Sequence, residues 1–132
     1  MFRTRVVVVA LIMALPLALE ARADSSTQLI AMWDSDHDKT LDLAEVNKAA
    51  AAEFDKLDVD HDGTLDMREL GHRITRAEFL AADKDRDGTL DKEEYEAIVT
   101  ERFHAANRDN DTTIEAKELR TRAGRRLLAL LM

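Results

Sequence analysis

The stretch DVDHDGTLDMRE, residues 58–69, decides the fold, because close copies of it recur along the chain. Each copy has an oxygen-bearing side chain at positions 1, 3, 5, 9 and 12, threonine at position 7, and leucine or isoleucine at position 8. Such self-similarity predicts one structural unit that is used several times. The four segments align without gaps: Asp34–Glu45 (DSDHDKTLDLAE), Asp58–Glu69 (DVDHDGTLDMRE), Asp83–Glu94 (DKDRDGTLDKEE) and Asn107–Glu118 (NRDNDTTIEAKE).

The spacing of these side chains fits the coordination of calcium. Calcium takes about six to eight oxygen ligands, which a 12-residue loop supplies from side chains at positions 1, 3 and 5 and from the carbonyl of position 7. Position 9 often acts through water, and a glutamate at position 12 closes the site with both oxygens. The candidate ligands are Asp34, Asp36, Asp38, Thr40, Asp42, Glu45, Asp58, Asp60, Asp62, Thr64, Asp66, Glu69, Asp83, Asp85, Asp87, Thr89, Asp91, Glu94, Asn107, Asp109, Asp111, Thr113, Glu115 and Glu118.

The charge of the chain supports this interpretation. The 132 residues have a net charge of −8, and residues 24–132 contain 26 acidic side chains, of which 19 stand at candidate ligand positions. Carboxylates crowded in this way raise each other's pKa unless a cation neutralises them. Solvated acidic turns are the alternative, since D-x-D-x-D-G forms turns by itself, but four copies that all end in glutamate favour four bound calcium ions.

Other functions find little support in the sequence. The chain has no cysteine, which excludes a disulfide framework and a thiolate zinc site. Its acidic balance argues against nucleic acid as a partner. The sequence contains no G-x-S-x-G, H-E-x-x-H or phosphate-loop motif, so we expect no enzymatic activity.

The four loops resemble those of the EF-hand calcium-binding family, and of its exported, bacterial-type four-hand members in particular. The resemblance covers nearly all of residues 24–132 and implies an all-α fold of helix–loop–helix repeats that binds up to four Ca2+. It also implies that loops pair through a short two-stranded contact at position 8, which is occupied by Leu41, Leu65, Leu90 and Ile114. Entering helices usually place a core residue four positions before the loop, where this chain has Ile30, Phe54, Phe79 and Phe103.

Differences among the loops rank the four sites. Gly63 and Gly88 supply the glycine that the sharp turn at position 6 favours. The first loop has Lys39 there, and a residue other than glycine pays about 1 kcal/mol or more for the left-handed conformation. The fourth loop has the β-branched Thr112 at this position and Asn107 at position 1. We expect loops 2 and 3 to bind most tightly, followed by loop 1 and then loop 4.

The spacing between loops predicts shared helices. Only 12 or 13 residues separate one loop from the next, so one helix must leave one loop and enter the following one. Residues 43–57 and 92–106 read as continuous helices of about 22 Å each. Loops at the two ends of such a rod cannot pair with each other.

The middle connection differs, because Gly71 and the capping box Thr75–Glu78 predict a break followed by a new helix. Loops 2 and 3 can then fold back and pair, and loops 1 and 4 would pair at the far end. This predicts one compact all-α domain with the pairings 2–3 and 1–4. The alternative is four hands strung loosely without pairing.

Residues 1–23 read as a secretory signal peptide. Arg3 and Arg5 give a positive start, Val6–Leu19 is an apolar run, and Ala21–Ala23 fits a cleavage site. Residues 24–132 then form the four-EF-hand domain, and the protein is exported to the periplasm or secreted. No stable membrane span is expected after cleavage.

The C-terminal tail, residues 120–132, has two interpretations. As the last exit helix it would pack Leu127, Leu128 and Leu131 into the core. As an arginine- and leucine-rich helix it could instead bind a membrane surface or a partner, and Gly124 could break the helix and free it.

Two roles compete within calcium binding. A buffer or calcium-stabilised structural protein exposes little new surface, whereas a calmodulin-like sensor opens a groove for a protein partner. Residues 24–132 contain only three methionines to line such a groove, which favours the buffer or structural role. A dockerin-like interaction module that binds an unidentified protein partner is the alternative.

Overall fold

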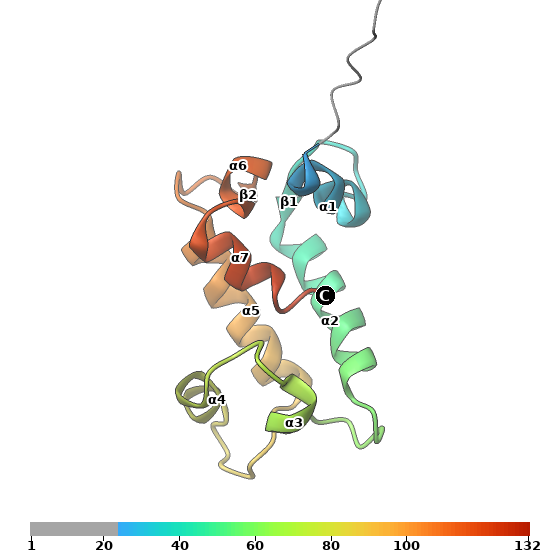
Figure 1. Ribbon diagram of the computed structural model, residues 1–132, viewed down its shortest axis with the longest axis vertical. Coiled ribbons are helices and arrows are strands. Elements are labelled where there is room, and N and C mark those ends of the chain that lie inside the picture. Colours follow the sequence, from blue (N-terminus) through green and yellow to red (C-terminus); the bar gives the residue numbers. More distant parts are fainter. Residues whose placement is uncertain (1–23) are drawn as a thin grey trace, which may run out of the picture.

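The computed structural model describes residues 24–132, so the proposed signal peptide lies outside the described residues. The described chain is mainly helical, with a small two-stranded sheet (Figure 1). This confirms the all-α class. The elements are α1 (Ser25–Trp33), β1 (Leu41–Asp42), α2 (Leu43–Leu57), α3 (Met67–Leu70), α4 (Arg76–Ala82), α5 (Lys92–Ala106), β2 (Thr113–Ile114), α6 (Ala116–Leu119) and α7 (Arg122–Leu128).

The two long helices, α2 and α5, are the shared helices that the loop spacing predicts. Each has 15 residues and begins with a capping box, Asp42 with Glu45 in α2 and Asp91 with Glu94 in α5. They pack against each other and run along the long axis of the molecule (Figure 1). The rings of Phe54 and Tyr95 meet edge to face between them, with centroids 5.7 Å apart.

The loops pair 1 with 4 and 2 with 3, as predicted. In the sheet, β1 is antiparallel to β2 and Leu41 stands opposite Ile114. At the other end of the molecule, Leu65 and Leu90 form a single bridge, in which each N–H donates to the other carbonyl at 2.8 Å. The rigid shared helices hold the two loop pairs apart at opposite ends (Figure 1).

The break between loops 2 and 3 also lies where the sequence places it. The short helix α3 ends at Gly71, which has a φ of +58°. Thr75 then caps α4: its hydroxyl accepts the N–H of Glu78 at 3.2 Å, and the Glu78 carboxylate accepts the N–H and the hydroxyl of Thr75 at 2.9 and 2.8 Å. The chain therefore reverses here and brings loop 3 beside loop 2.

The core is formed by the residues that the repeat predicts to be buried. All four position-8 side chains are completely inaccessible, and so is Tyr95. The residues four positions before each loop are buried as well, namely Ile30, Phe54, Phe79 and Phe103. Each loop is therefore anchored to the core by its position-8 residue and by the buried residue of the helix that enters it.

The C-terminal tail packs into this core. Leu127, Leu128 and Leu131 are buried in agreement with the first interpretation, and Leu130 is buried with them. The prediction that Gly124 could break the helix is wrong, because Gly124 lies inside α7. A Cβ at this position would stand 2.2 Å from the carbonyl oxygen of Glu118, so the missing side chain allows α7 to lie directly against α6. Within residues 24–132, no helix has the length and apolar character to cross a membrane.

Candidate metal sites

Carboxylates converge in each of the first three loops. The residues at positions 1, 3 and 12 bring oxygen atoms within 4.8 Å of one another. The three groups are Asp34, Asp36 and Glu45; Asp58, Asp60 and Glu69; and Asp83, Asp85 and Glu94. In every group the position-1 aspartate is buried and the position-3 aspartate is exposed, so each cluster opens to solvent on one side.

Backbone N–H groups hold the position-1 aspartates in place. In loop 2, Asp58 accepts the N–H of Asp62 at 3.1 Å with one oxygen and the N–H of Gly63 at 3.0 Å with the other. Loops 1 and 3 repeat both bonds at closely similar distances. These bonds close the loop around its first candidate ligand.

The glutamate at position 12 joins the two ends of its loop. In loop 2, one oxygen of Glu69 accepts the N–H of Val59 at 3.1 Å, and the other accepts the N–H of Asp66 at 3.0 Å. The carboxylate of Asp66 at position 9 accepts the N–H of Glu69, so Asp66 caps helix α3. The aspartates at position 9 of loops 1 to 3 thus cap the helices that follow the loops. They lie outside the three-carboxylate clusters, which agrees with ligation through water.

The threonine at position 7 has a contact that sequence reasoning missed. In loop 2, the hydroxyl of Thr64 donates to Asp62 at 2.8 Å, and its N–H donates to the same oxygen at 2.8 Å. The same pair occurs in the other three loops. The hydroxyl therefore orients the position-5 carboxylate, and the oxygen that position 7 offers to an ion is its carbonyl. The invariance of threonine in the four repeats was the signal for this role.

The loops also require a left-handed residue at position 4, which the sequence analysis did not foresee. His37, His61, Arg86 and Asn110 all have φ between 55° and 63°. Asparagine and histidine tolerate this conformation better than most residues, so three of these four side chains were a usable signal. The histidines are exposed on the outside of their loops.

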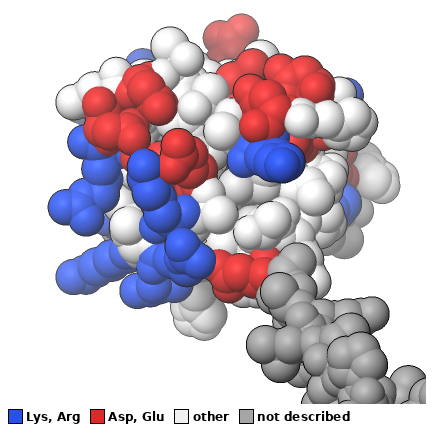
Figure 2. Space-filling model, turned by 90° about the horizontal axis from the view of Figure 1, so that it is seen from above, with Lys and Arg blue, Asp and Glu red and all other residues white. Residues whose placement is uncertain are grey.

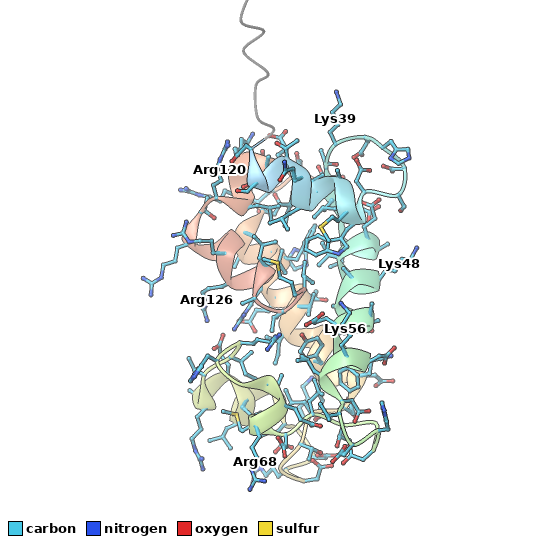
Figure 3. The ribbon with its side chains drawn as sticks, turned by 45° about the vertical axis from the view of Figure 1, so that its right-hand side comes forward. Lys39, Lys48, Lys56, Arg68, Arg120 and Arg126 are labelled. Atoms are coloured by element: carbon cyan, nitrogen blue, oxygen red, sulfur yellow. The ribbon has the colours of Figure 1, made fainter. Side chains whose placement is uncertain are left out.

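Position 6 is left-handed in three loops. Gly63 and Gly88 have φ of +83° and +87°, and Lys39 adopts +69° in loop 1, as the sequence analysis expected. The Lys39 side chain points away from the molecule into solvent (Figure 3). Its N–H still reaches Asp34 at 2.9 Å, so loop 1 keeps the geometry of loops 2 and 3 at the cost of a strained residue.

Loop 4 differs from the other three. Thr112 does not adopt a positive φ, and its N–H does not bond to Asn107 as the position-6 N–H groups bond to Asp34, Asp58 and Asp83. Asn107 instead donates its amide to the carbonyl of Asp111 at 2.6 Å, and its buried Oδ1 has no partner among the described residues. Thr112 therefore lacks the left-handed conformation, which is sterically costly for a β-branched residue.

A lysine also occupies the acidic face of loop 4. Lys117 lies 2.7 Å from Glu115 and 3.5 Å from Asp109, which are candidate ligands at positions 9 and 3. The hydrogen bond and the charge of Glu115, with a smaller contribution from Asp109, raise the pKa of Lys117. Within residues 24–132, loop 4 forms no group of three converging carboxylates.

The crowding of charge is visible in the position-3 aspartates. Burial raises the pKa of Asp60 by disfavouring its charged form, the backbone N–H of Asp62 opposes this, and the neighbouring carboxylates of Asp62 and Glu69 raise it further. The pKa of Asp85 is raised as well: the backbone N–H of Asp87 lowers it, but burial and the charges of Asp87 and Glu94 outweigh that bond. A cation placed among these oxygens would relieve the repulsion.

Comparison with known proteins identifies part of this arrangement. The EF-hand family model matches two segments of the chain, residues 51–72 and 75–99. They contain loops 2 and 3 together with α3, α4 and parts of the two long helices. No curated protein matches the chain. The matched repeats are the two with glycine at position 6, which are also the two without strain or rearrangement at that position.

Proposed function

We propose that this protein binds calcium in its loops. The observation that carries the proposal is the convergence of three carboxylates at the same repeat positions in loops 1, 2 and 3. The converging ligand atoms are all oxygens. Calcium prefers oxygen ligands, whereas zinc and copper favour nitrogen and sulfur. The EF-hand match over loops 2 and 3 supports the same ion.

The proposal includes a ranking of the sites. Loops 2 and 3 have the unstrained glycine and the complete set of bonds to the position-1 aspartate, so we expect them to bind most tightly. Loop 1 keeps these bonds with a left-handed lysine and ranks next. Loop 4 has Asn107 without the equivalent bonds and has Lys117 among its carboxylates, so it ranks last.

We propose that the protein acts as a calcium buffer or a calcium-stabilised structural protein. The position-8 residues and the phenylalanines of the entering helices are buried together in one core, and a buffer or structural protein keeps such residues covered. Four large apolar side chains remain exposed, and they lie in different parts of the chain: Met32 in α1, Val59 in loop 2, Leu80 in α4 and Met132 after α7.

A calcium-dependent sensor or interaction module is the second candidate. One observation favours it: a cleft of about 700 Å3 between α1 and α7, lined mainly by apolar side chains that include Leu29, Leu119, Leu128 and Met132. A partner helix with an apolar face would fit such a cleft. This role requires the cleft to open further when calcium binds.

Calcium titration with two readouts tests these proposals together. Calorimetry of the purified protein should detect at least two tight sites, which are lost in the variant Glu69→Gln/Glu94→Gln. Glu101→Gln, an exposed carboxylate outside the loops, is the matched control and should bind like the parent protein. Absence of calcium binding to the parent protein would overturn the proposal.

The second readout separates the two roles. A dye that fluoresces on exposed apolar surface should lose signal as calcium is added if calcium tightens the core, which is the expected result. A signal that rises with calcium would support the sensor or interaction module instead.

Export is proposed from the sequence of residues 1–23 alone. The positive start, the apolar run and the Ala-x-Ala site are the supporting observations. N-terminal sequencing of the protein recovered from expressing cells tests it. The expected start is Asp24, and a retained Met1 would contradict cleavage.

A further inference from the structure

An arginine-lined cleft stands apart from the calcium loops. It has a volume of about 470 Å3 and lies between the α3–α4 connection and α7, with α5 contributing one side chain. Its charged lining consists of Arg73, Arg102, Arg122, Arg125 and Arg126, with Glu78 as the one carboxylate. Basic side chains gather along one side of the molecule in Figure 2, and Arg126 points to the side opposite Lys48 in Figure 3.

Three of these arginines are bound within the protein. Arg102 is buried, and its guanidinium donates to the carbonyls of Arg126 and Arg73 at 2.5 and 3.0 Å and to Glu78 at 3.0 Å. Arg126 also pairs with Glu78. Arg73 pairs with Glu53 at 3.3 Å. These contacts fix the wall of the cleft and compensate part of its charge.

Two arginines on α7 remain without a carboxylate. Arg122 and Arg125 are exposed and form no ion pair within residues 24–132, and Arg125 donates only to the carbonyl of Arg120 at 2.5 Å. The Nε–H groups of Arg73 and Arg102 are buried and have no acceptor in the described part of the chain. These two atoms are enclosed by protein, so the positive charge that the cleft offers to a ligand lies on Arg122 and Arg125.

The chemistry of these groups selects the ligand. A guanidinium presents paired N–H groups that match two oxygens of a phosphate or carboxylate. Two uncompensated charges match the dianion of a phosphate monoester, whereas a carboxylate would neutralise only one of them. We propose that this cleft binds a dianionic phosphate group, held between Arg122 and Arg125.

The binding does not depend on the proposed calcium sites. No residue that lines the cleft belongs to a calcium loop. A protein that failed to bind calcium could therefore still bind phosphate here, and the two proposals fail separately.

Calorimetric titration with glycerol 3-phosphate tests the proposal. The purified protein is titrated in calcium buffer, with the same ligand injected into buffer alone as the reference. We expect one site per chain and at least a tenfold weaker affinity in Arg122→Gln/Arg125→Gln. Circular dichroism should show that this variant is folded, since both side chains are exposed.

The matched control removes two positive charges elsewhere. In Arg68→Gln/Lys48→Gln, both side chains are exposed and neither lines the cleft (Figure 3). We expect this variant to bind like the parent protein. The proposal is overturned if the parent protein does not bind, if both double variants weaken binding equally, or if acetate binds as tightly as glycerol 3-phosphate.

Vesicles distinguish the two sources of such a phosphate. Phosphatidylcholine vesicles with and without phosphatidic acid are sedimented with the parent protein. Selective co-sedimentation with phosphatidic acid, lost in Arg122→Gln/Arg125→Gln, identifies a lipid headgroup as a ligand. Binding of glycerol 3-phosphate without co-sedimentation supports a free phosphate monoester.

Discussion

Position 6 of the loops shows how one residue can set the quality of a metal site. Glycine occupies it at no steric cost in loops 2 and 3, and Lys39 occupies it with strain in loop 1. Thr112 does not adopt the left-handed conformation at all, and the bonds that would draw the loop around Asn107 are not made. The same position therefore produces three different outcomes in one molecule.

Replacement of Thr112 by glycine should strengthen the fourth site. Glycine can take the left-handed turn and present its N–H to Asn107 without the cost of about 1 kcal/mol that threonine would pay, which corresponds to about a fivefold gain in affinity. Calorimetry of Thr112→Gly measures this gain. Thr112→Ala is the control, because it removes the β-branch without allowing the left-handed turn at low cost, and it should gain less. An unchanged fourth site in Thr112→Gly would contradict the argument.

At the scale of elements, the contact between α6 and α7 depends on a missing side chain. Helix propensity alone predicts that Gly124→Ala stabilises α7 by about 1 kcal/mol. The new Cβ would meet the backbone of Glu118 and Leu119, so we expect destabilisation by about 1–3 kcal/mol instead. Chemical unfolding measures the sign of the change. A more stable variant would show that the two helices are not held together this closely.

Glu78, in the first turn of α4, should make the stability of the fold depend on pH. Burial would raise the pKa of Glu78, but hydrogen bonds from Thr75 and the Arg102 guanidinium lower it to about 2. The folded pKa lies below the unfolded value of 4.5, so the charged form stabilises the fold above pH 4.5 and this contribution is lost as the pH falls toward 2.

The variant Glu78→Gln should therefore lose about 2 kcal/mol of stability at neutral pH and much less near pH 2. Unfolding curves of the parent protein and the variant across this range measure the difference. A constant difference at every pH would show that the ion pairs with Arg102 and Arg126 do not stabilise the fold.

The sequence predicted the elements whose causes are local. The bounds of α2 and α5 follow from capping residues that are adjacent to them in the sequence, and the break at Gly71 and Thr75 follows in the same way. The fit of Gly124 against Glu118 depends on how two helices approach in space, so the sequence left open a helix break where the structure has close packing. The contacts of Lys117 and the arginine cleft were missed for the same reason.

At the scale of the whole molecule, the loop pairs divide the four sites into two units. Because Leu41 stands opposite Ile114, a substitution in loop 1 should change the calcium affinity of loop 4 more than that of loops 2 and 3. We expect Glu45→Gln to weaken calcium binding at loop 4 as well as at loop 1. In NMR calcium titrations of this variant and the parent protein, the chemical shift changes of the Leu41 and Ile114 amides should differ between the two proteins. Those of the Leu65 and Leu90 amides should be the same in both.

The reciprocal variant Glu69→Gln is the control, and it should disturb Leu65 and Leu90 while the other pair stays unchanged. A response of Leu65 to Glu45→Gln equal to that of Ile114 would show that the long helices transmit binding across the molecule.

The pairing of the first loop with the last also orders the events of folding. Leu65 and Leu90 are separated by a short stretch of chain, whereas Leu41 and Ile114 stand near opposite ends of the described residues. Closing the longer segment costs more conformational entropy, so the middle pair should form early and the terminal pair late. The last step then joins the first loop to the fourth, and Leu41→Ala should mainly accelerate unfolding, while Leu65→Ala should mainly slow refolding.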